Sequence, residues 1–332
     1  MFTHNGKKNG YIVTTVAVST LFLGALSSCQ KTNTPTEKLN IDERGRNIAT
    51  NNGDITPYPS VLELFTCKPS DVAFVAAHRG THESSKYPEN TVESLQALHE
   101  NGVQFAEIDV ARLKDGTQFL FHDGTWDLRS TGTGPITMTT WEQSQQIFLK
   151  DTNGKITSIR PSSFADILAF AKDKIYLEID FQPSVDEAKV LNSIRDADMT
   201  DQVILISHNA EQALRLYKLA PKMALSVGIF TPGDIKKMED LGIPTNIMTV
   251  WTGEKQVPDD LAKALRDKKI PIIVGSFDLD DILQASGDFT PYTNFAIHPD
   301  LVVSDFAFDA QETLQIKGED KSRLDACLKA NK

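Results

Sequence analysis

The stretch from residue 74 to residue 132 combines two histidines with a closely spaced pair of acids. His78 ends an apolar run, and His122 follows a second β-rich run. Glu107 and Asp109 are two residues apart in a third apolar run, so on a strand both carboxylates point to the same face. Two carboxylates directed at one point repel each other unless a cation lies between them, and a hard divalent ion with oxygen ligands is the usual solution. Two imidazoles beside such an ion indicate acid–base chemistry on a phosphate ester.

Six short motifs follow one another in this stretch: His78-Arg79-Gly80, Pro88-Glu89-Asn90-Thr91, Glu107-Ile108-Asp109-Val110, Asp115-Gly116, His122-Asp123 and Ser130-Thr131-Gly132 with Gly134. In type and order they resemble the motifs of the glycerophosphodiester phosphodiesterase family. The resemblance implies hydrolysis of glycerophosphodiesters to sn-glycerol 3-phosphate and an alcohol. It is strong over 72–132, moderate at 175–207 and faint beyond.

The resemblance also implies roles for the two histidines. One of His78 and His122 would take the proton from the glycerol 2-hydroxyl, which attacks phosphorus, and the other would protonate the departing alcohol. A cyclic phosphate would form and then be opened by water. The sequence does not say which histidine does which. The remaining histidines, His82, His99, His208 and His298, are expected to be structural or on the surface.

Four polar residues next to these groups are expected to support the site. The guanidinium of Arg79 suits two phosphate oxygens, although a salt bridge to Glu89 that only shapes the loop is the alternative. Glu89, Asn90 and Asp123 are expected to brace or orient the site rather than react.

The third metal ligand has two alternatives. The family has a Glu-x-Lys strand whose glutamate completes the metal site and whose lysine binds the phosphoryl group, and here Tyr176 to Pro183 reads YLEIDFQP. We favour Asp180 as the ligand with Gln182 at the phosphate-binding lysine position, because Pro183 follows Gln182 and a proline often follows that lysine in the family. In the other register Glu178 is the ligand. Either way the lysine is absent. All-oxygen ligands favour one Ca²⁺ or Mg²⁺ over zinc.

Length and charge are consistent with one large exported domain. The chain has 332 residues, 40% of them hydrophobic, and a formal net charge of −11, so neither a nucleic-acid partner nor an anionic membrane surface is expected. Strand-like runs at 72–77, 105–110, 118–122, 175–180, 203–207, 224–229, 246–251, 270–275 and 300–304 alternate with helical patterns at 91–101, 163–172, 185–197, 209–219, 232–240 and 259–268. This alternation predicts a (β/α)8 TIM barrel with its active groups at the strand carboxyl ends. A doubly wound open sheet is the alternative, but no Gly-rich nucleotide loop supports it.

Nine strand candidates are one too many for eight barrel strands. No crossover helix fits between 110 and 118, so 105–122 is predicted to be a hairpin turning at Asp115-Gly116. Residues 124–162 break the alternation and are expected to form a small inserted subdomain beside the barrel mouth, within a phosphodiesterase domain that spans 61–332.

The N-terminal sequence is typical of a signal peptide for export. Lys7 and Lys8 precede an uncharged run that ends in Leu-Ser-Ser before Cys29. Residues 1–28 are therefore predicted to be a lipoprotein signal peptide, with Cys29 lipidated and residues 29–60 forming a flexible tether. The protein is then expected to be exported and anchored to the bacterial envelope, at the outer membrane. An ordinary signal peptide or an uncleaved anchor is the alternative.

Two further cysteines, Cys67 and Cys327, lie near opposite ends of the expected domain. Because exported chains meet oxidising conditions, we expect them to form a disulfide, with two separate buried thiols as the alternative. Three functions compete: the glycerophosphodiester phosphodiesterase, a lysophospholipase D or inositol phosphodiesterase on the same fold, and a non-catalytic surface binding lipoprotein.

Overall fold

The computed structural model describes residues 40–41, 47–48, 59–70, 72–81, 87–314 and 318–330. The chain divides into two units, Met1–Pro57 and Tyr58–Lys332. In the first unit β1 (Asn40–Ile41) and β2 (Asn47–Ile48) pair antiparallel, within the segment expected to be a tether. The predicted signal peptide and Cys29 lie outside the described residues.

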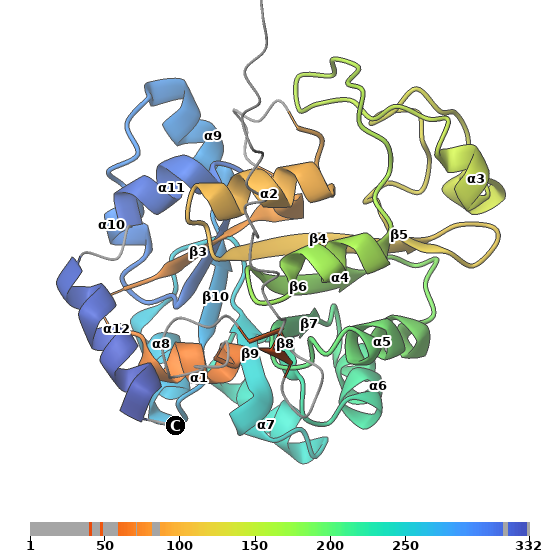
Figure 1. The fold of residues 1–332 in the computed structure, drawn as a ribbon. Coiled ribbons are helices and arrows are strands. Elements are labelled where there is room, and N and C mark those ends of the chain that lie inside the picture. The colour runs from red at the N-terminus through yellow and green to blue at the C-terminus, as the bar shows by residue number, and fades with distance from the viewer. Residues whose placement is uncertain are drawn as a thin grey trace, which may run out of the picture. The chain divides into compact units, whose positions relative to one another are not determined.

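Eight parallel strands of the second unit close into a barrel (Figure 1). They are β3 (Phe74–Ala77), β4 (Phe105–Arg112), β6 (Tyr176–Phe181), β7 (Val203–Ile206), β8 (Ala224–Gly228), β9 (Met248–Trp251), β10 (Ile272–Gly275) and β11 (Leu301–Ser304). Strand β3 pairs with β11 on one side and with β4 on the other, which closes the sheet. The predicted (β/α)8 barrel is therefore confirmed, and the open-sheet alternative is wrong.

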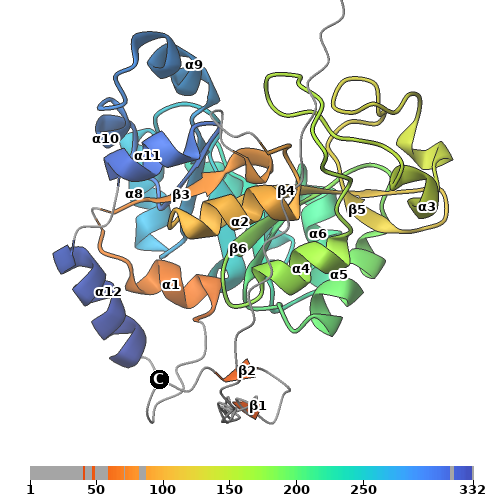
Figure 2. The same cartoon turned by 45° about the horizontal axis from the view of Figure 1, so that its top comes forward.

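Helices surround these strands (Figures 1 and 2). They are α1 (Val61–Cys67), α2 (Val92–Glu100), α3 (Trp141–Ser144), α4 (Phe164–Ala171), α5 (Glu187–Asp196), α6 (Ala210–Leu219), α7 (Pro232–Asp240), α8 (Asp259–Asp267), α9 (Phe277–Ser286), α10 (Tyr292–Phe295), α11 (Ala307–Leu314) and α12 (Gly318–Ala330). The six helices expected between strands are present, whereas α9 to α12 were not anticipated.

Side chains alternate between two apolar layers, as the period of a strand requires. On β4, Ile108 and its outward neighbours join the layer between the strands and the helices. Phe105 faces inward and stacks on Tyr176 with ring centroids 4.9 Å apart. Because inward positions recur every second residue, the acids that follow Phe105 and Tyr176 continue up the barrel interior.

The extra strand candidate is β5 (Gln118–Leu120), which pairs antiparallel with β4. The predicted hairpin is confirmed, and Gly116 lies in its turn with φ of 92°, where a side chain would be strained. After the hairpin, the amide N–H of Phe121 donates to the carbonyl of Asp109 at 3.0 Å. This contact returns the chain to the mouth at His122.

Residues 124–162 pack against the β4–β5 hairpin. They contain a 3₁₀ turn (Ile136–Met138) and α3. Trp126 is fully buried against Phe119 and Phe121, and its indole N–H donates to Thr139 at 2.9 Å. This small apolar cluster is separate from the barrel core.

The amino ends of the strands are covered by α1, with α12 beside it (Figure 2). A disulfide joins Cys67 of α1 to Cys327 of α12, the pair expected from the sequence. Within the described residues, no helix combines the length and apolarity that a membrane span requires.

Candidate active site

Three carboxylates converge at the carboxyl ends of β4 and β6. Register places Asp109 directly beside Asp180, and Glu107 beside Glu178. Ligand oxygens of Glu107, Asp109 and Asp180 lie within 4.8 Å of one another. Glu178 sits one layer deeper in the barrel, so the geometry favours the register in which Asp180 is the third ligand.

The buried carboxylates of this cluster would be stabilised in their charged form by a bound cation. Burial and the neighbouring Asp109 raise the pKa of Glu107 well above its usual range, and burial also raises the pKa of Asp109. Below them, burial raises the pKa of Glu178 to about 8, and its Oε2 atom has no hydrogen-bond partner among the residues that the structure describes. An all-oxygen donor set this rich in carboxylates fits a hard divalent ion.

Neutral donors orient the acids without cancelling their charge. The Asn90 side chain donates to Asp109 Oδ2 at 2.8 Å and accepts the Asp109 N–H at 2.9 Å. The Gln182 amide donates to Asp109 Oδ1 at 2.8 Å, and the backbone N–H of Arg79 donates to Glu107 at 2.8 Å. Gln182, which we expected at the lysine position of the family with a role in phosphate binding, therefore contacts a carboxylate.

Two residues next to the acids adopt left-handed backbone conformations. Arg79 has φ of 53° and Asn90 has φ of 59°. The N–H of Asn90 donates to the carbonyl of Arg79 at 2.7 Å, which ties the two loops together. Non-glycine residues in this region cost of order 1–3 kcal/mol each, and such strain is concentrated at functional sites.

His78 follows β3 and is held on two sides. Its Nδ1 lies 2.8 Å from Asp305 Oδ1, just after β11, and its ring packs against Phe277 with centroids 4.5 Å apart. An imidazole that donates from Nδ1 to a carboxylate presents the lone pair of Nε2. His78 is therefore oriented to exchange a proton through Nε2.

His122 is oriented in the same manner. Its Nδ1 lies 2.9 Å from Asp123 Oδ1, and its Nε2 lies 3.1 Å from an Arg79 guanidinium nitrogen. Because arginine only donates, Nε2 of His122 is the acceptor. The Arg79 guanidinium also lies 3.5 Å from Glu89. The ion pair with Glu89, one of the two contacts expected of Arg79, is therefore present, and the contact with a phosphate stays a prediction.

A second arginine was missed by the sequence analysis. Arg129 of the inserted segment lies 3.2 Å from Glu89 and 3.9 Å from Asp123. The Arg129 guanidinium lies beside Glu89, the partner of Arg79, and beside Asp123, the partner of His122. These contacts hold the inserted segment against the site. Arg129 directly precedes the Ser130-Thr131-Gly132 motif, and this adjacency is the signal that could have identified it.

A buried acid lies behind Asp305. Asp280 of α9 accepts the backbone N–H of Asp305 at 2.8 Å and the hydroxyls of Ser276 at 2.8 Å, Ser304 at 3.1 Å and Tyr292. Burial raises the pKa of Asp280. The network fixes the peptide that carries the carboxylate partner of His78.

His208 makes a contact that the sequence analysis did not predict. Its side chain is exposed, as expected of a surface histidine, but its Nε2 lies 2.7 Å from Asp180 Oδ1 at the edge of the carboxylate cluster. The hydrogen bond to Asp180 raises the pKa of His208. Its position directly after β7 is the signal that could have identified it.

Aromatic rings form one side of the mouth. Trp251 at the end of β9 packs on Phe277 with ring centroids 6.4 Å apart, and Phe277 in turn packs on His78. Gly275 permits this arrangement, because a Cβ there would lie 2.5 Å from Trp251. Trp251 also packs against the apolar residues inside the barrel, so it contributes both to the core and to the side of the mouth.

The structure thus brings the predicted site residues into one connected group, with Glu178 beneath it. The group contains His78, Arg79, Glu89, Asn90, Glu107, Asp109, His122, Asp123, Asp180 and Gln182. Cys67 and Cys327 belong to α1 and α12, which cover the opposite end of the barrel.

Comparisons of the sequence with known proteins find related phosphodiesterases. A family model described as the glycerophosphoryl diester phosphodiesterase family matches residues 78–266. Human glycerophosphodiester phosphodiesterase 1 is 36% identical over 92 residues, which is 27% of this chain and 27% of that protein. A glycerophosphodiester phosphodiesterase of Caldanaerobacter subterraneus is 27% identical over 161 residues, which is 46% of this chain and 65% of that protein.

Solved structures share the fold. A glycerophosphoryl diester phosphodiesterase from Parabacteroides distasonis aligns with a TM-score of 0.69 and 24% identity, covering 78% of this chain and 93% of that one. An Oleispira antarctica phosphodiesterase, solved in complex with the product sn-glycerol-3-phosphate, aligns with a TM-score of 0.55 and 19% identity, covering 74% and 98%. Because the family model spans more than half of the sequence, the chain belongs to the glycerophosphoryl diester phosphodiesterase family.

Proposed function

We propose that this protein hydrolyses glycerophosphodiesters to sn-glycerol 3-phosphate and an alcohol. The observation that carries the proposal is the convergence of two carboxylate-oriented imidazoles, a guanidinium and three acids at one barrel mouth. Family membership and the product bound to the Oleispira antarctica relative support the same reaction.

His78 and His122 carry the proton transfers. Each has its Nδ1 against a carboxylate, which leaves Nε2 as the nitrogen that exchanges protons with the substrate. In His122, the substrate would replace Arg79 as the partner of Nε2. One Nε2 takes the proton of the glycerol 2-hydroxyl as that oxygen bonds to phosphorus. The other gives a proton to the departing alcohol oxygen as its bond to phosphorus breaks. Water then opens the cyclic phosphate with the two proton transfers reversed.

Arg79 and the acid cluster stabilise the charge of the phosphoryl group. The Arg79 guanidinium stands beside His122 Nε2, where a phosphate oxygen would meet it. Glu107, Asp109 and Asp180 would hold one Ca²⁺ or Mg²⁺, which supplies Lewis acidity toward phosphoryl oxygens. Asn90 and Gln182 keep Asp109 in place for that role.

The test is product analysis with glycerophosphocholine in Ca²⁺ or Mg²⁺. We expect sn-glycerol 3-phosphate and choline in equal amounts, and no turnover of the analogue whose glycerol 2-hydroxyl is methylated. Equal turnover of the methylated analogue would contradict the 2-hydroxyl mechanism. A complete lack of hydrolysis would favour the surface binding lipoprotein, which the retained carboxylate partners of both histidines argue against.

We also propose that the protein is exported and lipid-anchored to the bacterial envelope through Cys29. The basic residues, apolar run and Leu-Ser-Ser before Cys29 support this proposal. Metabolic labelling with a fatty acid should label the wild type and not a Cys29→Ala variant. Equal labelling of both proteins would exclude the anchor.

A further inference from the structure

A hydrogen-bond donor from a neighbouring segment holds each acid of the metal site. Glu107 and Asp109 accept from groups that follow β3, precede α2 and follow β6. The third acid, Asp180, accepts from His208, whose Nε2 lies 2.7 Å from Asp180 Oδ1. Among the residues that the structure describes, His208 is the one side-chain donor to Asp180. His208 therefore completes a set of outer partners around the three carboxylates.

The His208 contact fixes a carboxylate that is otherwise free to turn. The torsion that rotates an aspartate carboxylate has only broad preferences, so the orientation of the group depends on its partners. An ionised carboxylate only accepts hydrogen bonds, so Nε2 of His208 carries the hydrogen. Both the imidazolium and the neutral Nε2–H tautomer meet this requirement, and the contact therefore does not depend on the charge of the ring.

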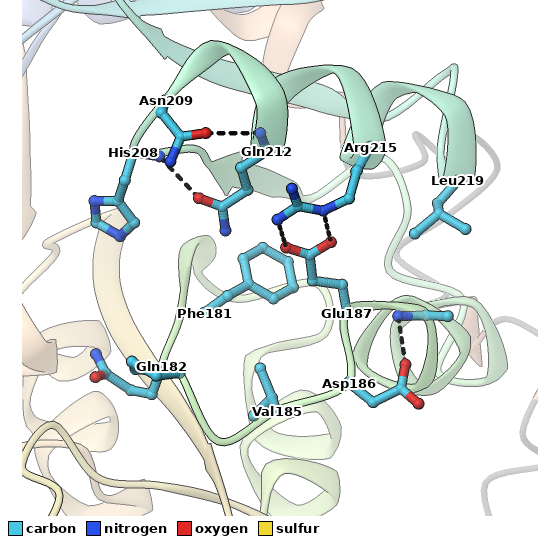
Figure 3. A pocket seen from close by; sticks show the side chains of 12 residues that line it. Phe181, Gln182, Val185, Asp186, Glu187, His208, Asn209, Gln212, Arg215 and Leu219 are labelled. Atoms are coloured by element: carbon cyan, nitrogen blue, oxygen red, sulfur yellow. Dashed lines mark hydrogen bonds and ion pairs between the residues drawn. The ribbon is translucent and has the colours of Figure 1, made fainter.

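The backbone that carries His208 is anchored on both sides. Before it, the N–H and the hydroxyl of Ser207 both donate to the carbonyl of Ser226 on β8, at 3.0 and 2.6 Å. After it, the His208 N–H donates to the buried side chain of Gln212 at 3.0 Å (Figure 3). Asn209 caps the start of α6 by accepting the Gln212 N–H at 2.9 Å. A side chain on so fixed a backbone can hold its partner in one orientation.

Folding stability does not account for the pair of His208 with Asp180. The His208 side chain is 58% exposed, and ion pairs at exposed positions contribute little to stability. The Asp180 side chain, in contrast, is only 17% exposed and belongs to the carboxylate cluster. The consequence of the contact therefore falls on the geometry of Asp180 as a ligand.

We propose that His208 is a positioning residue, which orients Asp180 toward the ion and so raises the affinity of the mouth carboxylates for Ca²⁺ or Mg²⁺. The inference rests on the metal site of the proposed function. Outer partners of this kind contribute about 10–100-fold to the affinity of a metal site. A role through charge alone would have the opposite sign, because removing a positive group beside a bound cation would tighten the binding.

The experiment is calorimetric titration of EDTA-treated, dialysed protein with Ca²⁺ and with Mg²⁺. His208→Phe keeps a planar ring but removes the donor, and His208→Gln places an amide N–H where Nε2 lies. His298→Phe is the matched control, because His298 Nε2 lies 2.8 Å from Asp259 outside the mouth. We expect the Kd of the ion to rise about tenfold or more in His208→Phe, to stay within about threefold of wild type in His208→Gln, and to be unchanged in His298→Phe.

The ion concentration that gives half-maximal turnover of glycerophosphocholine should rise by the same factor in His208→Phe. An unchanged or lower Kd in that variant, or an equal rise in His298→Phe, would overturn the role of His208 while the proposed function stands. A loss of turnover at saturating ion with an unchanged Kd would overturn it as well, since His208 would then act on the substrate. Wild type that binds neither ion would instead refute the metal site of the proposed function, and the role of His208 with it.

Discussion

The two ends of the barrel handle charge in opposite ways. At the amino ends of the strands, Lys68 lies 2.9 Å from Asp300, which Arg266 also contacts at 2.6 Å. At the carboxyl ends, Glu107, Asp109 and Asp180 gather around one point, and the donors to Glu107 and Asp109 named above are backbone or neutral side-chain groups. Asp180 is paired with His208. One end neutralises each buried charge, whereas the other concentrates like charges.

Backbone and packing show the same contrast. Phe65 of α1 stacks on Phe105 with centroids 5.7 Å apart, and the disulfide holds α12 beside α1. At the mouth, Arg79 and Asn90 are in left-handed conformations, and within the described part of the chain Arg79 Nε and Glu178 Oε2 have no hydrogen-bond partner. Barrel enzymes place stability at the amino end and chemistry at the carboxyl end, and here the difference can be followed residue by residue.

The largest effect should come from the mouth histidines. We expect His78→Ala and His122→Ala each to lower kcat by about 10³-fold, within the range of general acid–base catalysis, with Tm nearly unchanged. His298→Ala, a histidine paired with Asp259 and outside the mouth, is the matched control and should keep full activity. Near-normal turnover in either mouth variant would remove that histidine from the mechanism.

A smaller effect, on stability alone, should come from the opposite end. The disulfide joins residues 260 positions apart, so we expect Cys67→Ser/Cys327→Ser to lower the free energy of unfolding by about 2–5 kcal/mol. Thermal melts under oxidising conditions measure this loss. The value of kcat at 25 °C should match wild type, and a large fall in kcat for the folded variant would break the separation of the two ends.

The smallest effect should come from the network behind His78. Asp280→Asn weakens the hold on the Asp305 peptide, so we expect kcat to fall about tenfold while KM stays constant. A parallel change in KM, or an equal effect of Asp281→Asn at the exposed neighbouring position, would show that Asp280 has no positioning role. Steady-state kinetics on the three proteins decide between these outcomes.

Sequence could predict the mouth because its motifs are local. Glu107 and Asp109 share a face through strand period alone, and His78 follows its strand directly. Asp280 reaches the site only through tertiary contacts between distant segments, which local patterns do not encode. His208 directly follows a strand and Arg129 directly precedes a motif, but their contacts with Asp180 and Glu89 are set by the tertiary fold. The choice between Glu178 and Asp180 likewise needed the pairing of β4 with β6.

Helices α9 to α12 were missed for a related reason. In α9, acids at Asp278, Asp280 and Asp281 interrupt the apolar period, and Asp280 is buried by tertiary hydrogen bonds rather than exposed. The periodic signal that identifies a surface helix is therefore weak there. The hairpin, in contrast, was predictable, since its connection is too short for a crossover helix.

Metal dependence tests the central claim most directly. The mouth carboxylates should bind one Ca²⁺ or Mg²⁺ per chain in calorimetry, and EDTA-treated protein should lose glycerophosphodiester turnover and recover it when the ion is restored. Asp109→Asn should neither bind the ion nor recover, although it folds. Full turnover by the metal-free wild type, or normal ion binding by Asp109→Asn, would contradict the account.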